Sequence, residues 1–105
     1  MRHARGMAER RIAGWIEGAN TWLAVFYIAR LVGYDFDDCD WQAIALGLEG
    51  TDADADRWFD YPLVGKMPVQ LLLARHVDAE PVMVTVLGNL DDVLAARIET
   101  ALDIY

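Results

Sequence analysis

The spacing of apolar residues changes from one segment of the chain to the next, and these periods predict its secondary structure. Between Arg57 and Gly88 the pattern is that of three consecutive strands. The predicted strands are Arg57–Val64, Pro68–His76 and Pro81–Leu87, joined by turns at residues 65–66 and 78–80. β-Branched side chains dominate the last strand, PVMVTVLG, and they fit a pleated surface better than a helix. We expect the rest of the chain to be organised around this sheet.

Helical patterns flank these strands on both sides. From Ala8 to Val32 apolar residues recur at spacings of three and four, which predicts a helix. Two glycines weaken its first half, so a division near residues 20–21, with Thr21 capping a second helix, stays open. The segment WLAVFYIARLV is apolar nearly all round, which predicts burial on more than one side. A final helix is expected after Asn89, a good N-cap residue, because one apolar stripe follows it.

The segment WQAIALGLEG at residues 41–50 fits two patterns. Trp41, Ile44 and Leu48 have helical spacing behind Asp40 as a cap, whereas alternate residues of the same run are apolar, as in a strand. We favour a strand, because a fourth strand makes a better platform for two helices than three strands alone.

The predicted fold is therefore α+β, with a four-stranded antiparallel meander sheet flanked by an N-terminal and a C-terminal helix, in the order α-β-β-β-β-α. The 105 residues, 55% of them apolar, suffice for one hydrophobic core and argue against two. We predict a single domain covering residues 1–105, in which residues 1–7 are disordered.

Alternation along the predicted strands places apolar side chains on both faces of the sheet. The face toward the helices would carry Phe59, Tyr61, Leu63, Val69, Leu71, Leu73, Val82, Val84 and Val86. The opposite face, called the second face below, would carry Trp58, Val64, Leu72, Ala74, Met83 and Leu87. A solvated sheet face is normally more polar than this, and an exposed apolar patch marks a contact surface. We expect a homodimer through Val64, Leu72, Met83 and Leu87, or contact with another protein; a loop or part of a divided first helix over this face is the alternative.

Acidic residues are concentrated in one part of the chain. The formal charge is −8, and nine of the 17 acidic residues lie between residues 35 and 60. Nucleic acids and anionic membranes are therefore not expected as partners, because both attract basic surfaces. We expect a basic protein partner instead, because dense charge of one sign steers association. The predicted contact residues are Asp37, Asp38, Asp52, Asp54 and Asp56, with Trp58 as an aromatic anchor. Solvated loops that only aid solubility are the alternative.

Few residues suggest catalysis or a cofactor. The chain has no serine, and Cys39 lies among aspartates whose charge disfavours a reactive thiolate. The run at 52–56 begins like a calcium-binding loop, but Arg57 stands where such a loop needs glycine. Two histidines and one cysteine are too few for a zinc site. We expect no enzymatic activity, no metal and no cofactor.

One cysteine, and acidic residues that interrupt the N-terminal apolar run, fit a cytoplasmic protein without a signal peptide. The leading hypothesis is a small acidic protein-interaction module without catalytic activity, such as an inhibitor or immunity-type protein that masks a basic toxin. The alternative is a small-ligand or metal-binding domain with a site between sheet and helices, around Trp41, Tyr61 and His76. A third hypothesis is an enzyme built on Cys39 and the nearby aspartates.

Overall fold

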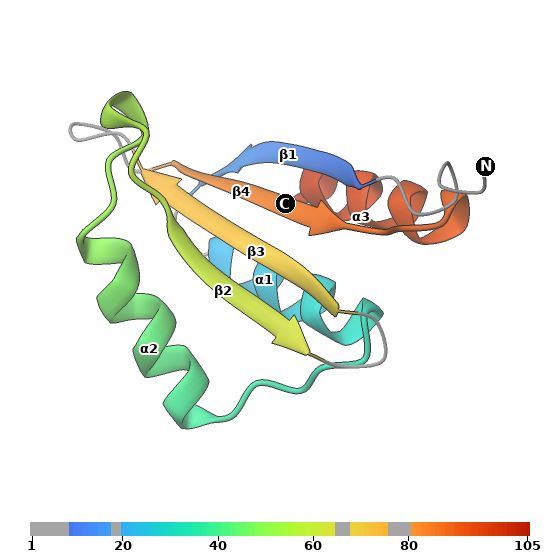
Figure 1. The fold of residues 1–105 in the computed structure, drawn as a ribbon, viewed down its shortest axis with the longest axis horizontal. Coiled ribbons are helices and arrows are strands. Elements are labelled where there is room, and N and C mark those ends of the chain that lie inside the picture. The colour runs from blue at the N-terminus through green and yellow to red at the C-terminus, as the bar shows by residue number, and fades with distance from the viewer. Residues whose placement is uncertain (1–8, 18–19, 65–67, 76–80) are drawn as a thin grey trace.

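A computed structural model of the protein describes residues 9–17, 20–64, 68–75 and 81–105, and of residue 64 only the backbone. Its elements are β1 (Arg10–Ile16), α1 (Asn20–Leu31), α2 (Asp38–Glu49), the 3₁₀ turn η2 (Ala53–Ala55), β2 (Phe59–Val64), β3 (Pro68–Arg75), β4 (Val82–Gly88) and α3 (Asp92–Ile104) (Figure 1). Several predictions concern parts outside the described residues: the disorder of residues 1–7, the turns at 65–66 and 78–80, both histidines, and the side chain of Val64.

The four strands form one sheet in the order β1-β4-β3-β2, and every neighbouring pair is antiparallel. β2, β3 and β4 are the three strands predicted between Arg57 and Gly88, and they form the meander. β1 pairs with the outer edge of β4. The α+β class and the four-stranded antiparallel sheet are thus confirmed, although the fourth strand comes from a different part of the chain than expected.

The strand predicted at residues 41–50 is wrong, because this segment lies within or directly after helix α2. Asp37 and Asp40 each accept a hydrogen bond from the other's backbone N–H, both at 2.9 Å, and so form a capping box. The helix buries Ile44 and Leu48, which lie one turn apart. The cap residue is thus Asp37, not Asp40, and Asp40 closes the box from inside the first turn.

The fourth strand is β1, which lies in the segment predicted to be a helix from Ala8 onward. The helical part begins only at Asn20, so the division left open near residues 20–21 is real. Thr21 does not cap the helix in the predicted way; its hydroxyl donates to the Ile16 carbonyl at 3.3 Å. A Cβ on Gly14 would lie 3.2 Å from Leu102 Cβ, so β1 packs closely against α3 and needs a small residue there.

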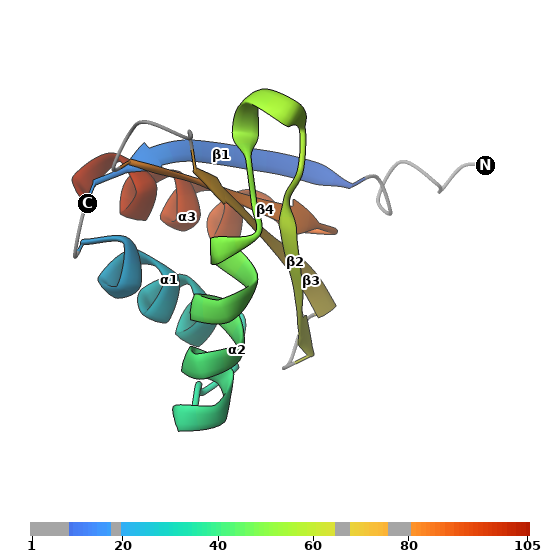
Figure 2. The ribbon, with the colours of Figure 1, turned by 90° about the vertical axis from the view of Figure 1, so that its left-hand side faces the viewer.

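Helices α1 and α3 pack side by side on one face of the sheet, and α2 lies along β2 (Figure 2). The strand residues predicted to face the helices all lie on this face. Between the layers the core includes Ile28 of α1, Val84 of β4 and Ile98 of α3, each 0% exposed. Helix α3 buries Ile98, Ala101 and Leu102 of the predicted apolar stripe, but Val93, which the same spacing assigns to the stripe, is 67% exposed. The N-cap of α3 is Asp91, which accepts from Leu94 N–H at 2.8 Å, rather than Asn89.

Candidate interaction surfaces

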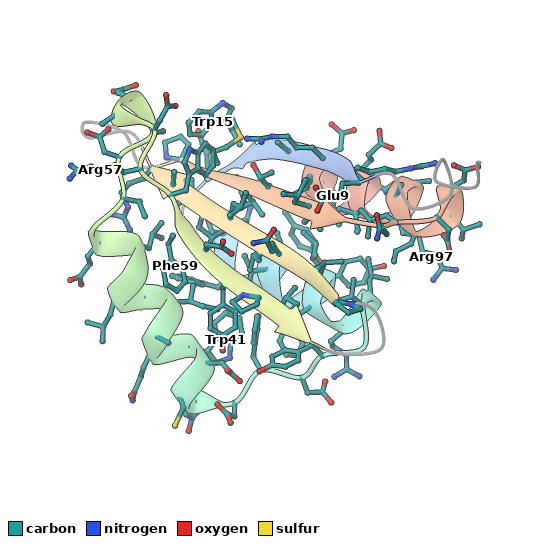
Figure 3. The ribbon with its side chains drawn as sticks, viewed as in Figure 1. Glu9, Trp15, Trp41, Arg57, Phe59 and Arg97 are labelled. Carbon is teal, nitrogen blue, oxygen red and sulfur yellow. The ribbon has the colours of Figure 1, made fainter. Side chains whose placement is uncertain are left out.

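None of the helices α1, α2 and α3 covers the second face of the sheet (Figure 2). Leu72, Met83 and Leu87 are half-buried on this face, as the alternation predicted. Trp15 of β1 belongs to the same face and keeps 43% of its surface exposed (Figure 3). Its place on the face was missed, because the segment was predicted to be helical. The described part of this face is therefore an apolar surface with an aromatic residue near one edge.

Thr85 occupies the centre of the second face, where it pairs with Ala13 of β1 and Leu72 of β3. The residue is 0% exposed, and its hydroxyl has no hydrogen-bond partner among the described residues. Burying a hydroxyl without a partner disfavours folding by about 1–3 kcal/mol. The hydroxyl is thus shut off from water although it lies on the face that α1 and α3 leave uncovered.

The acidic residues predicted to bind a partner fall into two groups at opposite ends of α2 (Figure 1). Asp37 and Asp38 lie at its N-terminus, whereas Asp52, Asp54 and Asp56 follow its C-terminus. A helix of 12 residues is about 18 Å long, so the two groups do not form one cluster. Trp58 lies after the second group and is half-buried.

The second acidic group forms a tight turn. The Asp52 carboxylate accepts from Asp54 N–H at 3.0 Å and caps η2, and Asp52 and Arg57 exchange two backbone hydrogen bonds of 2.9 Å. Asp56 adopts a left-handed conformation with φ of 56°, which an aspartate tolerates better than most residues. The calcium-like spacing therefore has a structural explanation, and no group of three metal-ligating side chains occurs in the described ranges.

Asp40 connects α2 to the rest of the molecule through two tyrosines. The hydroxyl of Tyr34 donates to Asp40 Oδ1 at 3.1 Å, and the hydroxyl of Tyr61 on β2 donates to the same oxygen. The bond from Tyr61, followed by that from the Asp37 N–H, lowers the pKa of Asp40. Burial, reinforced by Asp40, raises the pKa of Tyr61 above its ordinary value. Asp40 is therefore held as a carboxylate, which suits a structural link better than a general acid.

We expect Tyr61→Phe to lower the free energy of unfolding by about 1 kcal/mol at neutral pH, because a hydrogen bond to a half-exposed carboxylate is lost. The pKa of Asp40 is lowered in the folded protein, so its contribution is present above the ordinary value of 3.8 and disappears as the pH falls through the folded-state pKa. Urea denaturation at neutral and at strongly acidic pH measures the difference. Tyr27→Phe, at an exposed tyrosine on α1, is the control. An equal loss of unfolding free energy in both variants would contradict a stabilising hydrogen bond between Tyr61 and Asp40.

Aromatic side chains fill the space between α1, α2 and β2. The Trp41 ring lies edge-on to Trp22, with centroids 5.7 Å apart, and is stacked near Phe26 at 6.2 Å. The centroid of the Phe36 ring lies 4.9 Å from that of Trp41 and 5.8 Å from that of Tyr61. The side chains of Trp41 and Phe59 extend from α2 and β2 into this region (Figure 3). These contacts hold the rings in defined positions.

A groove of about 510 Å³ opens between α1 and α2, and we call it the α1–α2 groove. It is lined by Trp22, Leu23, Phe26, Trp41 and Ala45. Helix α1 packs against the sheet and against α3, but Leu23 is 55% and Phe26 37% exposed, so one apolar side of the helix stays open to solvent. The all-round apolar pattern of α1 was the signal in the sequence for such a surface.

The predicted ligand site around Trp41, Tyr61 and His76 is brought together only in part. Phe36 joins Trp41 to Tyr61, but the Tyr61 hydroxyl is engaged by Asp40, and His76 lies outside the described residues. Cys39 is exposed in the first turn of α2. Tyr61 of the predicted ligand site therefore connects β2 to α2 through its hydrogen bond to Asp40.

The fold and its surfaces define a small α+β protein whose sheet carries helices on one face. The chain matches no protein-family model, no curated protein and no solved structure. Among the helices of the described residues, none has the length and apolar character needed to cross a membrane.

Proposed function

We propose that the chain is a protein-interaction module without catalytic activity, which pairs with a second copy through its second face and binds a basic protein partner with its acidic segment 35–60. An inhibitor or immunity-type protein is one form of such a module. The observation that carries the proposal is the half-buried apolar surface formed by Leu72, Met83 and Leu87 around the buried hydroxyl of Thr85, which has no hydrogen-bond partner in the described part of the chain.

The composition of the second face favours a self-complementary contact. On this face the central strands β3 and β4 carry only uncharged residues, such as Leu72 and Thr85. The two outer strands carry opposite charges, because Arg11 lies on β1 and Asp60 on β2. Burial of apolar surface stabilises such a contact by about 25 cal/mol for each Å² removed from water. The rim charges would select the orientation of the two copies, because like charges are kept apart.

The acidic segment supports the second half of the proposal. Asp38 is exposed in the first turn of α2, Asp56 is exposed directly after η2, and α2 itself contains no basic residue. Arg57 is the one basic residue of segment 35–60, against nine acidic residues, so the electrostatic field along it is mainly negative. Such a field would accelerate encounters with a basic protein and weaken with salt. Asp37 and Asp52 also cap elements, so their substitution would affect local structure as well as binding.

The dimer is tested by light scattering over a concentration series. We expect a mass near twice 11.8 kDa for the natural chain and a folded monomer for Leu72→Glu, because a buried, unpaired carboxylate cannot be accommodated in the interface. Val93→Glu on α3, at a residue that is 67% exposed, is the matched control and should remain dimeric. Circular dichroism establishes that each variant is folded. A natural chain that is monomeric at all concentrations, or a dimer that survives Leu72→Glu, would overturn this half of the proposal.

A further inference from the structure

The α1–α2 groove is an apolar surface for which the fold itself has no described use. Its walls are two tryptophans, a phenylalanine, a leucine and an alanine, and its 510 Å³ falls within the range of binding pockets, about 300–1,000 Å³. A helix that is apolar on all sides is normally covered on all sides. Helix α1 instead turns Leu23 and Phe26 toward the solvent. The groove is therefore a candidate contact surface independent of the sheet.

The groove is preformed. Trp41 is held from three directions by Trp22, Phe26 and Phe36, at centroid distances of 5.7, 6.2 and 4.9 Å. Helix α1 is anchored beneath it by wholly buried residues such as Val25 and Ile28. A rigid aromatic surface loses little conformational entropy when a partner binds, so its contacts contribute more fully to affinity.

The rim of the groove on α2 is acidic. Residues 38, 41, 45 and 49 are spaced by three or four and therefore share one face of the helix. Trp41 and Ala45 line the groove, and Asp38 and Glu49 flank them along that face, both exposed. The one basic side chain of the described α1, Arg30, lies over the Phe26 ring at 5.6 Å and pairs with Asp35 at 3.3 Å. The charge offered to a partner along α2 is thus negative.

We propose that the α1–α2 groove binds an amphipathic helix of the basic partner. The apolar stripe of that helix would lie on Trp22, Leu23 and Trp41, and lysine or arginine residues beside the stripe would approach Asp38 and Glu49. Trp41 and Ala45 line the groove, and the face of α2 that carries them runs from Asp38 to Glu49, the 12 residues of the helix, which matches a partner helix of about three turns. The charge of the rim favours this occupant over an uncharged apolar ligand. The inference rests on the proposed binding of a basic partner and is independent of the proposed dimer.

The test uses two fluorescein-labelled synthetic peptides, each about four helical turns long with the same leucine stripe. One carries lysine beside the stripe and the other carries glutamate at the same positions. Fluorescence anisotropy measures the binding of each peptide to the full chain. We expect the lysine peptide to bind at least about tenfold more tightly than the glutamate peptide, with the difference shrinking as salt is added.

Two pairs of variants locate the contact. Leu23→Asn removes an apolar wall without changing charge and should weaken binding of the lysine peptide by about tenfold, whereas Val93→Asn on α3 should leave it unchanged. Glu49→Gln on the rim should weaken binding by about threefold at low salt, and Glu99→Gln on α3 by less. Both members of each pair are exposed side chains on helices, so folding is preserved.

The possible outcomes distinguish helix binding in the α1–α2 groove from the proposed binding of a basic partner, on which it rests. Binding of the lysine peptide that Leu23→Asn leaves unchanged would overturn the groove as the site while leaving an acidic interaction module in place. Equal binding of both peptides would overturn the basic occupant and indicate a purely apolar one. Failure of both peptides to bind would overturn the helix as the occupant, and the mass measurement of Leu72→Glu would still decide the dimer.

Discussion

Gly47→Ala is expected to lower the free energy of unfolding by about 2 kcal/mol, although alanine is the better helix former by about 1 kcal/mol. A Cβ at this position would lie 2.0 Å from Phe59 Cδ1 and 2.1 Å from Cε1, so the ring would have to leave its place between α2 and β2. Chemical denaturation of the purified Gly47→Ala variant, compared with the natural chain, measures the change in the free energy of unfolding.

Gly50→Ala is the matched control for this prediction. Gly50 has φ of −92°, which any residue adopts, and an added Cβ would meet only the Gly47 carbonyl oxygen, at 3.8 Å. We expect a change within about 0.5 kcal/mol. Equal losses in the two variants would mean that α2 does not pack on Phe59 as described.

Leu71→Ala should lower the free energy of unfolding by about 3 kcal/mol, and Leu72→Ala by less than about 1 kcal/mol. Leu71 is 0% exposed and lies between Tyr61 and Val86 on the helix-covered face, so its truncation leaves a cavity. Leu72, its neighbour on β3, is half-buried on the second face. Chemical denaturation of both variants at high dilution, where a dimer dissociates, compares their free energies of unfolding.

The comparison between these two leucines distinguishes the faces of the sheet. Similar losses at high dilution would show that something within the chain covers the second face, which was the alternative left open by the sequence. A loss at Leu72 that appears only at high protein concentration would support the proposed dimer, because the side chain would then be buried by association.

The three strands after Arg57 could be predicted from the sequence because their pattern is local. The period of two leaves no choice of face once a strand forms, so Leu71 and Leu72 were assigned to opposite faces correctly. The same holds for the final helix, whose apolar stripe contains Ile98 and Leu102. Only its cap was misplaced, because Asn89 and Asp91 are both good cap residues and local chemistry does not rank them.

The fourth strand could not be predicted in this way. Ile12 and Ile16 fit a helical spacing as well as an alternating one, and the free edge of β4 decided between them by pairing with all seven residues of β1. Helix α3 then packed against β1, where Gly14 admits Leu102. Conversely, residues 41–50 are helical although the outer edge of β2 pairs with no described strand, because the capping box forms at Asp37 and the helix buries Ile44 and Leu48 together.

Some of the candidate interaction surfaces could be predicted from the sequence, and others are formed only by the tertiary structure. The second face and the acidic segment follow from the order of residues, since alternation and charge are properties of the chain itself. The α1–α2 groove and the link from Asp40 to Tyr61 exist only after α2 packs along β2, because residues distant in sequence must meet to form them. The sequence by itself thus determined three of the four strands and the two faces of the sheet that they form. The tertiary structure decided which segment completes the sheet and which apolar residues of α1 remain exposed, because both depend on the space that neighbouring elements leave.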